Sequence, residues 1–279
     1  MRHLTLCRFN SGLVALPTLV LACALIPAAL RAAETKAMEA ELNRTYKDQV
    51  LMLRNFYGGN HLRYDASGQL LERGRTGYWT VDGEVRFDGI KFRRAHIEVA
   101  GTRLWLAYDR KSKQFGQVRW PGNNVRIELE ADPRALTLPQ VQTLMAKVFL
   151  TKNEKWADFA PAYWRSFLSG RLGPDGSEQQ PLLHVPTPGH NDTPPIALPH
   201  EEPPYTEEAR KAKLQGTVAL WVIVDREGKV RDVQIARPLG LGLDDQAVET
   251  VRKWRFKPAT RDGVPVQVRV SVETTYRMF

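Results

Sequence analysis

The stretch VPVQVRVSVETTY, from Val264 to Tyr276, decides the fold of the C-terminal part of the chain. Valine, threonine and tyrosine occupy one phase of a period of two, and the other phase holds Pro265, Gln267, Arg269, Ser271, Glu273 and Thr275. This alternation predicts a strand with one buried face. At about 3.3 Å per residue the strand would extend roughly 40 Å, about twice the usual length. We expect part of its backbone to lack a partner within the domain, which favours a peptide-binding module over an enzyme.

The residues ahead of this strand predict a small α+β unit in the order helix, strand, strand, helix, strand. A short helix over 205–215 ends at Gly216, and a hairpin follows with strands over 217–224 and 229–236. The apolar residues of the second hairpin strand break their period of two once, which predicts a β-bulge. Asp244 is expected to cap the second helix, and the long strand closes the unit.

Several short motifs follow one another through residues 204–279. They are Pro204-Tyr205, Gly216-Thr217-Val218, Val224-Asp225, Gly228-Lys229-Val230, Leu243-Asp244 and Trp254-Arg255-Phe256-Lys257-Pro258-Ala259. In this order they resemble the C-terminal domain of TonB energy transducers, over about 75 of the 279 residues. The resemblance implies a three-stranded antiparallel sheet with two helices. Its structural positions are Tyr205, Gly216, Gly228, Asp244, Trp254, Phe256 and Pro258.

The resemblance also implies a partner. Such domains lie in the periplasm and grip the TonB box, an extended peptide of an outer-membrane transporter, by strand addition. Family members reach an inner-membrane proton-driven motor through a Pro-rich tether and an N-terminal membrane helix. The partner-binding residues expected here are Glu202, Pro203, Gln267, Arg269, Ser271, Glu273 and Thr275. The competing interpretation makes the last five the solvated face of a sheet and the first two the end of a linker.

A test of the edge is a proline at Val270, which is expected to abolish binding if the N–H of that residue faces the partner. Self-pairing of the exposed strand into a homodimer is a further alternative.

The chain departs from the family pattern in four places. Tyr205 is followed by Thr206, with prolines before it, and the loop Pro238–Gly242 lacks the usual serines. The first hydrophobic segment holds no ionisable residue for a motor contact, and a folded domain takes the place of the tether. The last two departures argue against energised transport.

The N-terminus carries a targeting segment in residues 1–33. Arg2 and Arg8 precede an uncharged apolar run over 13–30, and small residues follow it, so a secretory signal peptide cleaved after Ala32 or Ala33 is predicted. The alternatives are an uncleaved inner-membrane anchor facing the periplasm and a lipoprotein modified at Cys23. Cleavage removes three of the 40 basic residues and no acidic one, which leaves 37 against 31 and a net charge of +6.

Residues 34–170 predict a helix plus an antiparallel β domain. The helix is expected over 34–57. Short strand-like runs then lie over 61–65, 69–73, 77–81, 84–92, 95–100, 103–108, 115–120 and 125–130, and helices over 139–150 and 156–168 flank this curved meander. Residues 171–203 form a Pro-rich linker.

An alternative function rests on the aromatic residues of this domain. They are Tyr78, Trp79, Phe87, Phe92, Trp105, Tyr108, Phe115 and Trp120. If they line a concave pocket, the protein is a periplasmic carrier or sensor of a lipid or other apolar ligand, with the TonB-like domain as docking module. The competing interpretation is an ordinary core.

Other classes of function lack support in the sequence. No catalytic motif is present, and both cysteines, Cys7 and Cys23, fall in the targeting segment, so we predict a non-enzymatic protein without cofactors. His184, His190 and His200 are too irregularly spaced for a metal site, and His61 and His96 are interpreted as structural. No basic cluster with interleaved aromatics indicates nucleic acid.

Overall fold

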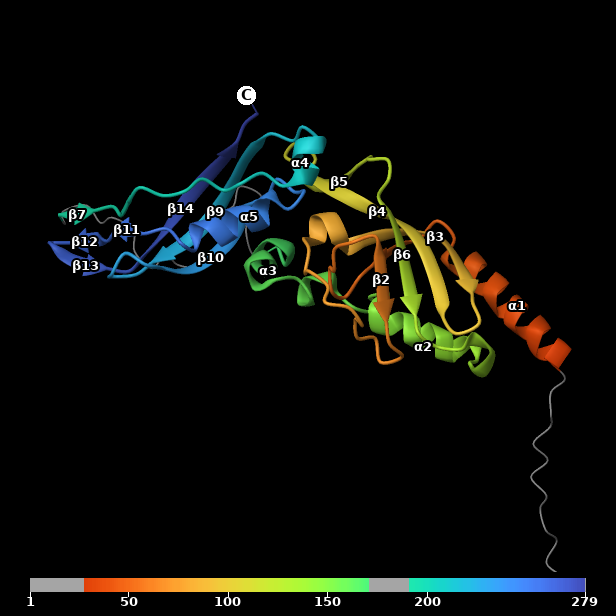
Figure 1. The fold of residues 1–279 in the computed structure, drawn as a ribbon. Helices are drawn as coiled ribbons and strands as arrows, with labels where there is room; N and C mark the ends of the chain where they lie inside the picture. Colours follow the sequence, from red (N-terminus) through yellow and green to blue (C-terminus); the bar gives the residue numbers. More distant parts are fainter. Residues whose placement is uncertain (1–27, 171–190, 279) are drawn as a thin grey trace, which may run out of the picture.

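The computed structural model describes residues 28–170 and 191–278, which form an N-terminal and a C-terminal unit of mixed helix and strand (Figure 1). The α+β class predicted from the sequence is therefore confirmed. The signal-peptide prediction falls largely on residues outside these ranges. Within the described residues, no helix is long and apolar enough to cross a membrane.

The N-terminal unit is a six-stranded sheet with two helices packed on one face. α1 (Ala28–Tyr46) leads into β1 (Val50–Met52), β2 (His61–Tyr64), the π-helical turn η1 (Trp79–Gly83), β3 (Glu84–Phe92), β4 (Ile97–Asp109), β5 (Gln114–Val118) and β6 (Asn124–Leu129). η2 (Pro133–Ala135), α2 (Leu138–Val148), η3 (Trp156–Asp158) and α3 (Ala162–Leu168) follow. The strand order is β1-β3-β4-β6-β2, and β5 pairs with the second half of β4. Leu42 of α1 and Val141 of α2 are fully buried in the core beneath the sheet.

This sheet differs from the predicted antiparallel meander, because β2 runs parallel to β6 and β1 pairs with β3. The helix predicted over 34–57 ends at Tyr46, since Asp48 takes a left-handed conformation with φ 57° and residues 50–52 join the sheet. The break predicted at Gly101 does not occur. A Cβ there would lie 2.3 Å from Val85 Cγ1, so glycine serves the close packing of β3 against β4.

Two further runs of the N-terminal unit differ from their predicted form. Residues 69–73 contribute a single bridge at Leu70, and residues 77–81 lead into η1, so neither is a strand. The helix predicted over 156–168 is divided into η3 and α3 by Pro161, which is the N-cap of α3.

The C-terminal unit contains the predicted three-stranded antiparallel sheet, in the order β10-β9-β14. Its elements are α4 (Glu207–Lys211), β9 (Gly216–Val224), β10 (Val230–Arg237), α5 (Leu243–Val251), β11 (Phe256–Lys257), β12 (Ala259–Arg261), β13 (Val264–Val266) and β14 (Val268–Tyr276). The predicted bulge is present between Val230 and Asp232. The single long strand is divided at Gln267, because β13 pairs with β12 and β14 pairs with β9.

The described end of the predicted linker is attached to this unit. β7 (Asp192–Thr193) pairs with β12, and β8 (Ile196–Ala197) pairs with β11. Trp254 Nε1 donates to the carbonyl oxygen of Glu201 at 3.1 Å. Residues 191–203 therefore follow the surface of the C-terminal unit, and residues 171–190 of the linker lie outside the described residues.

The two units share one hydrophobic core. Trp164 of α3 packs with Leu241, Leu243 and other apolar residues of the C-terminal unit. The loop 239–241 forms an isolated antiparallel β-bridge with β4, in which Tyr108 N donates to Leu239 O and Leu241 N donates to Leu106 O, both at 2.9 Å. The N-terminal unit is thus docked on the C-terminal unit.

The aromatic residues proposed for a pocket belong to the cores. Trp79, Phe87 and Trp105 are buried, and the rings of Tyr78, Phe92, Phe115 and Trp120 pack against buried clusters. The Trp79 ring contacts the rings of Phe115 and Trp164 edge-on at 4.9 and 5.2 Å. These contacts favour the core interpretation over the pocket.

Candidate peptide-binding edge

β14 is an edge strand with one open side. It pairs with β9 over its whole length, from Val268 opposite Val224 to Tyr276 opposite Gly216. Among the described residues, no backbone hydrogen bond reaches its other side. The opposite edge strand, β10, has α3 packed against it. β14 is therefore the more open edge of the sheet.

The register shows which backbone groups face the open side. At the closed end of the β9–β10 hairpin, Asp225 N donates to Lys229 O at 3.0 Å. Because backbone groups alternate in direction along a strand, the odd-numbered residues of β9 direct their N–H and C=O groups to β10, and the even-numbered residues direct theirs to β14. The even-numbered residues of β9 pair with the even-numbered residues of β14. The N–H and C=O groups that point away from β9 are consequently those of Arg269, Ser271, Glu273 and Thr275.

Four of the predicted partner-binding residues are thus the ones whose backbone faces outward. Gln267, the fifth predicted on this strand, lies exposed between β13 and β14. Val270 directs its N–H to β9 instead, so a proline there would remove an internal hydrogen bond, and the test residue on the open side is Ser271.

The side chains of these residues lie on the face of the sheet opposite α5. The Arg269 guanidinium sits 4.9 Å above the Trp221 ring, and Glu273 forms an ion pair with Arg237 at 2.7 Å. Thr275 shares a hydrogen bond with Thr217 at 3.1 Å. This face is exposed to solvent and ordered by contacts across the sheet.

Glu202 and Pro203 come from the segment that crosses the core side of the unit. Glu202 is exposed, and its carboxylate lies 3.8 Å from His200 Nε2. The His200 ring packs against Trp254 with centroids 3.6 Å apart and a tilt of 34° between the rings, which holds the segment in place. Burial raises the pKa of Tyr276, and the negative charges of Asp244, Asp245 and Glu202 raise it further.

The predicted structural positions hold this arrangement together. The Tyr205 ring meets Tyr276 edge-on at 5.3 Å, and Trp254 and Phe256 are buried. Gly228 has φ +76°, and a Cβ there would lie 1.8 Å from Phe256 O. A Cβ at Gly216 would lie 2.8 Å from Leu239 Cδ1. Pro258 separates β11 from β12.

Asp244 has a different role from the predicted helix cap. The N-cap of α5 is Gly242, with φ +75°, and the buried Asp244 carboxylate accepts from Leu239 N and Gly240 N, both at 2.7 Å. Burial and the neighbouring Asp245 raise the pKa of Asp244, and these two N–H groups counteract the rise. Asp244 therefore fixes the loop that contacts β4.

The contact between Asp245 and α3 was not predicted from the sequence. Asp245 Oδ1 accepts from Tyr163 Oη at 2.8 Å and from Trp164 Nε1 at 3.2 Å. The sequence did hold one signal of this contact, the glycine-rich loop Pro238–Gly242, which departs from the family pattern. Gly240 and Gly242 permit the close approach of the N-terminal unit to this loop.

Comparisons with known proteins place a related segment at the C-terminal end of the chain. The family model "Gram-negative bacterial TonB protein C-terminal" matches residues 201–278. Residues 201–278 are a TonB C-terminal segment. Protein TonB of Vibrio cholerae is 31% identical over 104 residues, which are 37% of this chain and 40% of that protein. Protein TonB of Xanthomonas campestris strain B100 is 34% identical over 77 residues, 27% of this chain and 34% of that protein.

The match is thus confined to part of each protein, since the chain spans about 40% of the length of the Vibrio TonB protein. The solution NMR structure of the Pseudomonas aeruginosa TonB C-terminal domain aligns with a TM-score of 0.27 and 22% identity, and covers 32% of this chain and 90% of that one. The family match covers the TonB-like unit and leaves residues 28–170 unassigned.

Proposed function

We propose that this protein binds an extended peptide, from an outer-membrane transporter or another envelope partner, by adding its strand to the open edge of β14. The proposal rests on the outward-facing backbone groups of Arg269, Ser271, Glu273 and Thr275, in a segment related to TonB. Strand addition draws its affinity from main-chain hydrogen bonds, and the flanking side chains supply selectivity. The proposed role is non-enzymatic and periplasmic.

The side chains beside the edge suggest how a peptide is selected. Arg269 and Glu273 carry opposite charges and lie four residues apart on the same face of β14, and the exposed Ser271 lies between them. Gln267 extends this row toward β13, and Glu202 and Pro203 are proposed to lie beside the bound peptide. A peptide with alternating polar residues complementary to Arg269 and Glu273 is therefore favoured over an apolar one.

The decisive experiment compares Ser271→Pro with Ser271→Ala. Proline is tolerated on an edge strand whose N–H faces solvent, so the fold is retained while one outward donor is lost and the ring obstructs the incoming strand. Alanine keeps the donor and removes only the hydroxyl. Fluorescence anisotropy with a labelled synthetic peptide from the periplasmic N-terminus of a TonB-dependent transporter gives the affinities.

We expect Ser271→Pro to weaken binding at least about tenfold, which corresponds to about 1.4 kcal/mol, and Ser271→Ala to change it less than about threefold. Circular dichroism checks that both variants are folded. Wild-type affinity in a folded Ser271→Pro protein would exclude this edge as the binding site.

A role in energised transport requires the N-terminal segment to remain in the inner membrane. The intact mass of the protein from its native host, together with its distribution between soluble periplasm and inner membrane, distinguishes the cases. A soluble species lacking the first 32 or 33 residues would limit the protein to binding.

A second candidate function is favoured by a hollow of about 500 Å³ between α1, β1 and α2. Tyr46, Met52, Met145, Phe149 and Trp156 are among its lining residues, and they differ from the aromatic residues selected from the sequence. An apolar ligand held there would make the protein a carrier or sensor. Native mass spectrometry of the protein purified from the envelope tests this, because a bound lipid adds a discrete mass that Met145→Trp should remove.

A further inference from the structure

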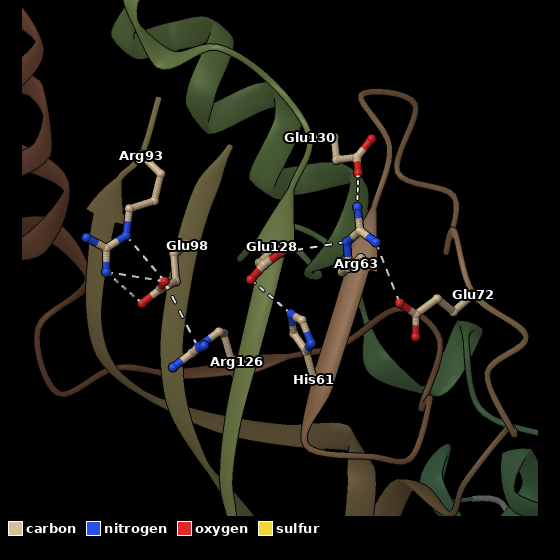
Figure 2. Close-up of polar contacts among 8 residues, drawn as sticks. All are labelled: His61, Arg63, Glu72, Arg93, Glu98, Arg126, Glu128 and Glu130. Atoms are coloured by element: carbon tan, nitrogen blue, oxygen red, sulfur yellow. Dashed lines mark hydrogen bonds and ion pairs between the residues drawn. The ribbon is translucent and has the colours of Figure 1, made fainter. Parts of the chain in front are cut away.

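The outer face of the N-terminal sheet, opposite α1 and α2, carries a row of charged side chains from β2, β4 and β6 (Figure 2). Near its centre, Glu98 of β4 stands directly opposite Glu128 of β6 in the antiparallel register. Their side chains are only 13% and 16% exposed. Like charges directly opposite one another on neighbouring strands are destabilising, so a cation between the two carboxylates would stabilise this pair.

Two imidazoles adjoin the carboxylates. His61 Nε2, from β2, lies 2.9 Å from Glu128 Oε1. His96 lies in the turn between β3 and β4, directly before the first residue of β4. The ligand atoms of His96, Glu98 and Glu128 all lie within 4.8 Å of one another. The carbonyl of His96 accepts from Arg93 N at 2.9 Å, which closes the β3–β4 turn and fixes the backbone at this position.

The neighbouring arginines contact these carboxylates at long distances. Arg93 donates to both carboxylate oxygens of Glu98 at 3.4–3.5 Å, Arg126 lies 4.0 Å from Glu98, and Arg63 lies 3.7 Å from Glu128. Strong guanidinium–carboxylate pairs are about 2.7–2.9 Å long.

We propose that His96, Glu98 and Glu128 bind a divalent transition-metal ion, that Zn²⁺ is the ion this donor set favours, and that His61 completes the site. Imidazole and carboxylate are established ligand types for Zn²⁺, at about 2.0–2.2 Å. In the tetrahedral geometry of Zn²⁺, donors at these bond lengths lie about 3.4 Å apart, so side-chain movements of about 1.4 Å would close the observed set. His61 and Glu98 also line an open hollow of about 510 Å³, which gives the ion access from solvent.

Removing a neighbouring arginine is expected to have the opposite effect on metal binding from removing a ligand. Arg126 is 60% exposed on its side chain and competes with the ion for Glu98. Removing this positive charge in Arg126→Gln should strengthen metal binding, whereas removing a ligand should weaken it. A ladder of ion pairs without a metal site would respond to neither change.

The test uses the full chain with Cys7→Ser and Cys23→Ser, so that no thiolate contributes, after treatment with a chelator. Isothermal titration calorimetry with Zn²⁺ measures stoichiometry and affinity, and the visible spectrum with Co²⁺ reports the coordination geometry. The ligand variants are Glu98→Gln and His96→Ala. The matched control is Glu72→Gln, a carboxylate of the same charged row that is 60% exposed and pairs only with Arg63 among the described residues, at 3.8 Å.

We expect one Zn²⁺ per chain. Each ligand variant should weaken binding at least about tenfold, since even the outer-shell partners of bound metals contribute about 10–100-fold. Glu72→Gln should leave the affinity unchanged, and Arg126→Gln should increase it. Absence of stoichiometric binding would overturn the proposal, as would wild-type affinity in both ligand variants or an equal loss in Glu72→Gln.

Discussion

Replacing Gly240 with alanine should separate the two units of the protein. Gly240 lies in the loop that forms a β-bridge with β4, with φ +98°, and a Cβ there would lie 2.3 Å from Leu106 O and 2.7 Å from Ala107 Cα. Both atoms belong to backbone and cannot rotate away. The matched control is Gly263→Ala, because Gly263 has φ +83° but no atom within 4 Å of the added Cβ.

The difference between the two variants measures the docking contact. A left-handed conformation costs a non-glycine residue roughly 1–2 kcal/mol, and this cost applies to both. Gly240→Ala also displaces the hydrogen bonds from Tyr108 N to Leu239 O and from Leu241 N to Leu106 O. At about 1 kcal/mol each, these bring its loss of unfolding free energy to roughly 3–4 kcal/mol, against roughly 1–2 kcal/mol for Gly263→Ala.

Urea denaturation followed by tryptophan fluorescence measures these free energies. Hydrogen exchange locates the change, since the amides of Leu241 and Tyr108 should lose protection in Gly240→Ala and keep it in Gly263→Ala. If the two variants differ by less than about 0.5 kcal/mol, the loop does not hold the units together and the reasoning fails.

Two other buried groups give predictions about stability. Arg103→Met should lower the free energy of unfolding by roughly 3–5 kcal/mol, measured by chemical denaturation. The Arg103 side chain is 5% exposed, pairs with Asp82 at 3.2 Å and donates to three backbone carbonyls. A loss below about 1 kcal/mol would contradict this prediction. Burial raises the pKa of Asp245 to about 6, above its value in the unfolded chain, so ionisation in the folded state lowers stability as the pH rises from about 4 through about 6. Asp245→Asn keeps an oxygen acceptor for Tyr163 and Trp164 but carries no charge. The free energy of unfolding of this variant, relative to wild type, should therefore increase as the pH rises from about 4 through about 6. A difference that stays constant over this pH range would refute the raised pKa of Asp245.

Much of the C-terminal unit could be predicted from the sequence because its signals are local. The alternation from Val268 to Tyr276, the bulge after Val230 and the turn at Gly228 each depend on neighbouring residues. The division of the last strand at Gln267 was missed, because periodicity does not reveal that β13 and β14 pair with different strands. Likewise, the outward direction of the Ser271 backbone required the register with β9.

The N-terminal unit was harder to predict because its topology depends on distant pairings. The run from Glu84 to Phe92 has the predicted bounds, yet the parallel pairing of β2 with β6 joins residues about 65 positions apart. The charged cluster shows the same limit. His61 lies on β2, Glu128 on β6 and His96 in the turn before β4, so no spacing along the chain indicates that they meet.

The docking of the two units bears on which partner strands the protein can accept. A three-stranded sheet presents two edges, and either one is a template for another chain. Here α3 packs against β10 and Asp245 binds Tyr163 and Trp164 of the same helix, so the N-terminal unit stands on the β10 side of the sheet. β14 then remains the edge for both a peptide and a second copy of this chain. Because both would use the outward groups of Ser271 and Glu273, strand-mediated dimerisation and peptide binding at this edge are mutually exclusive.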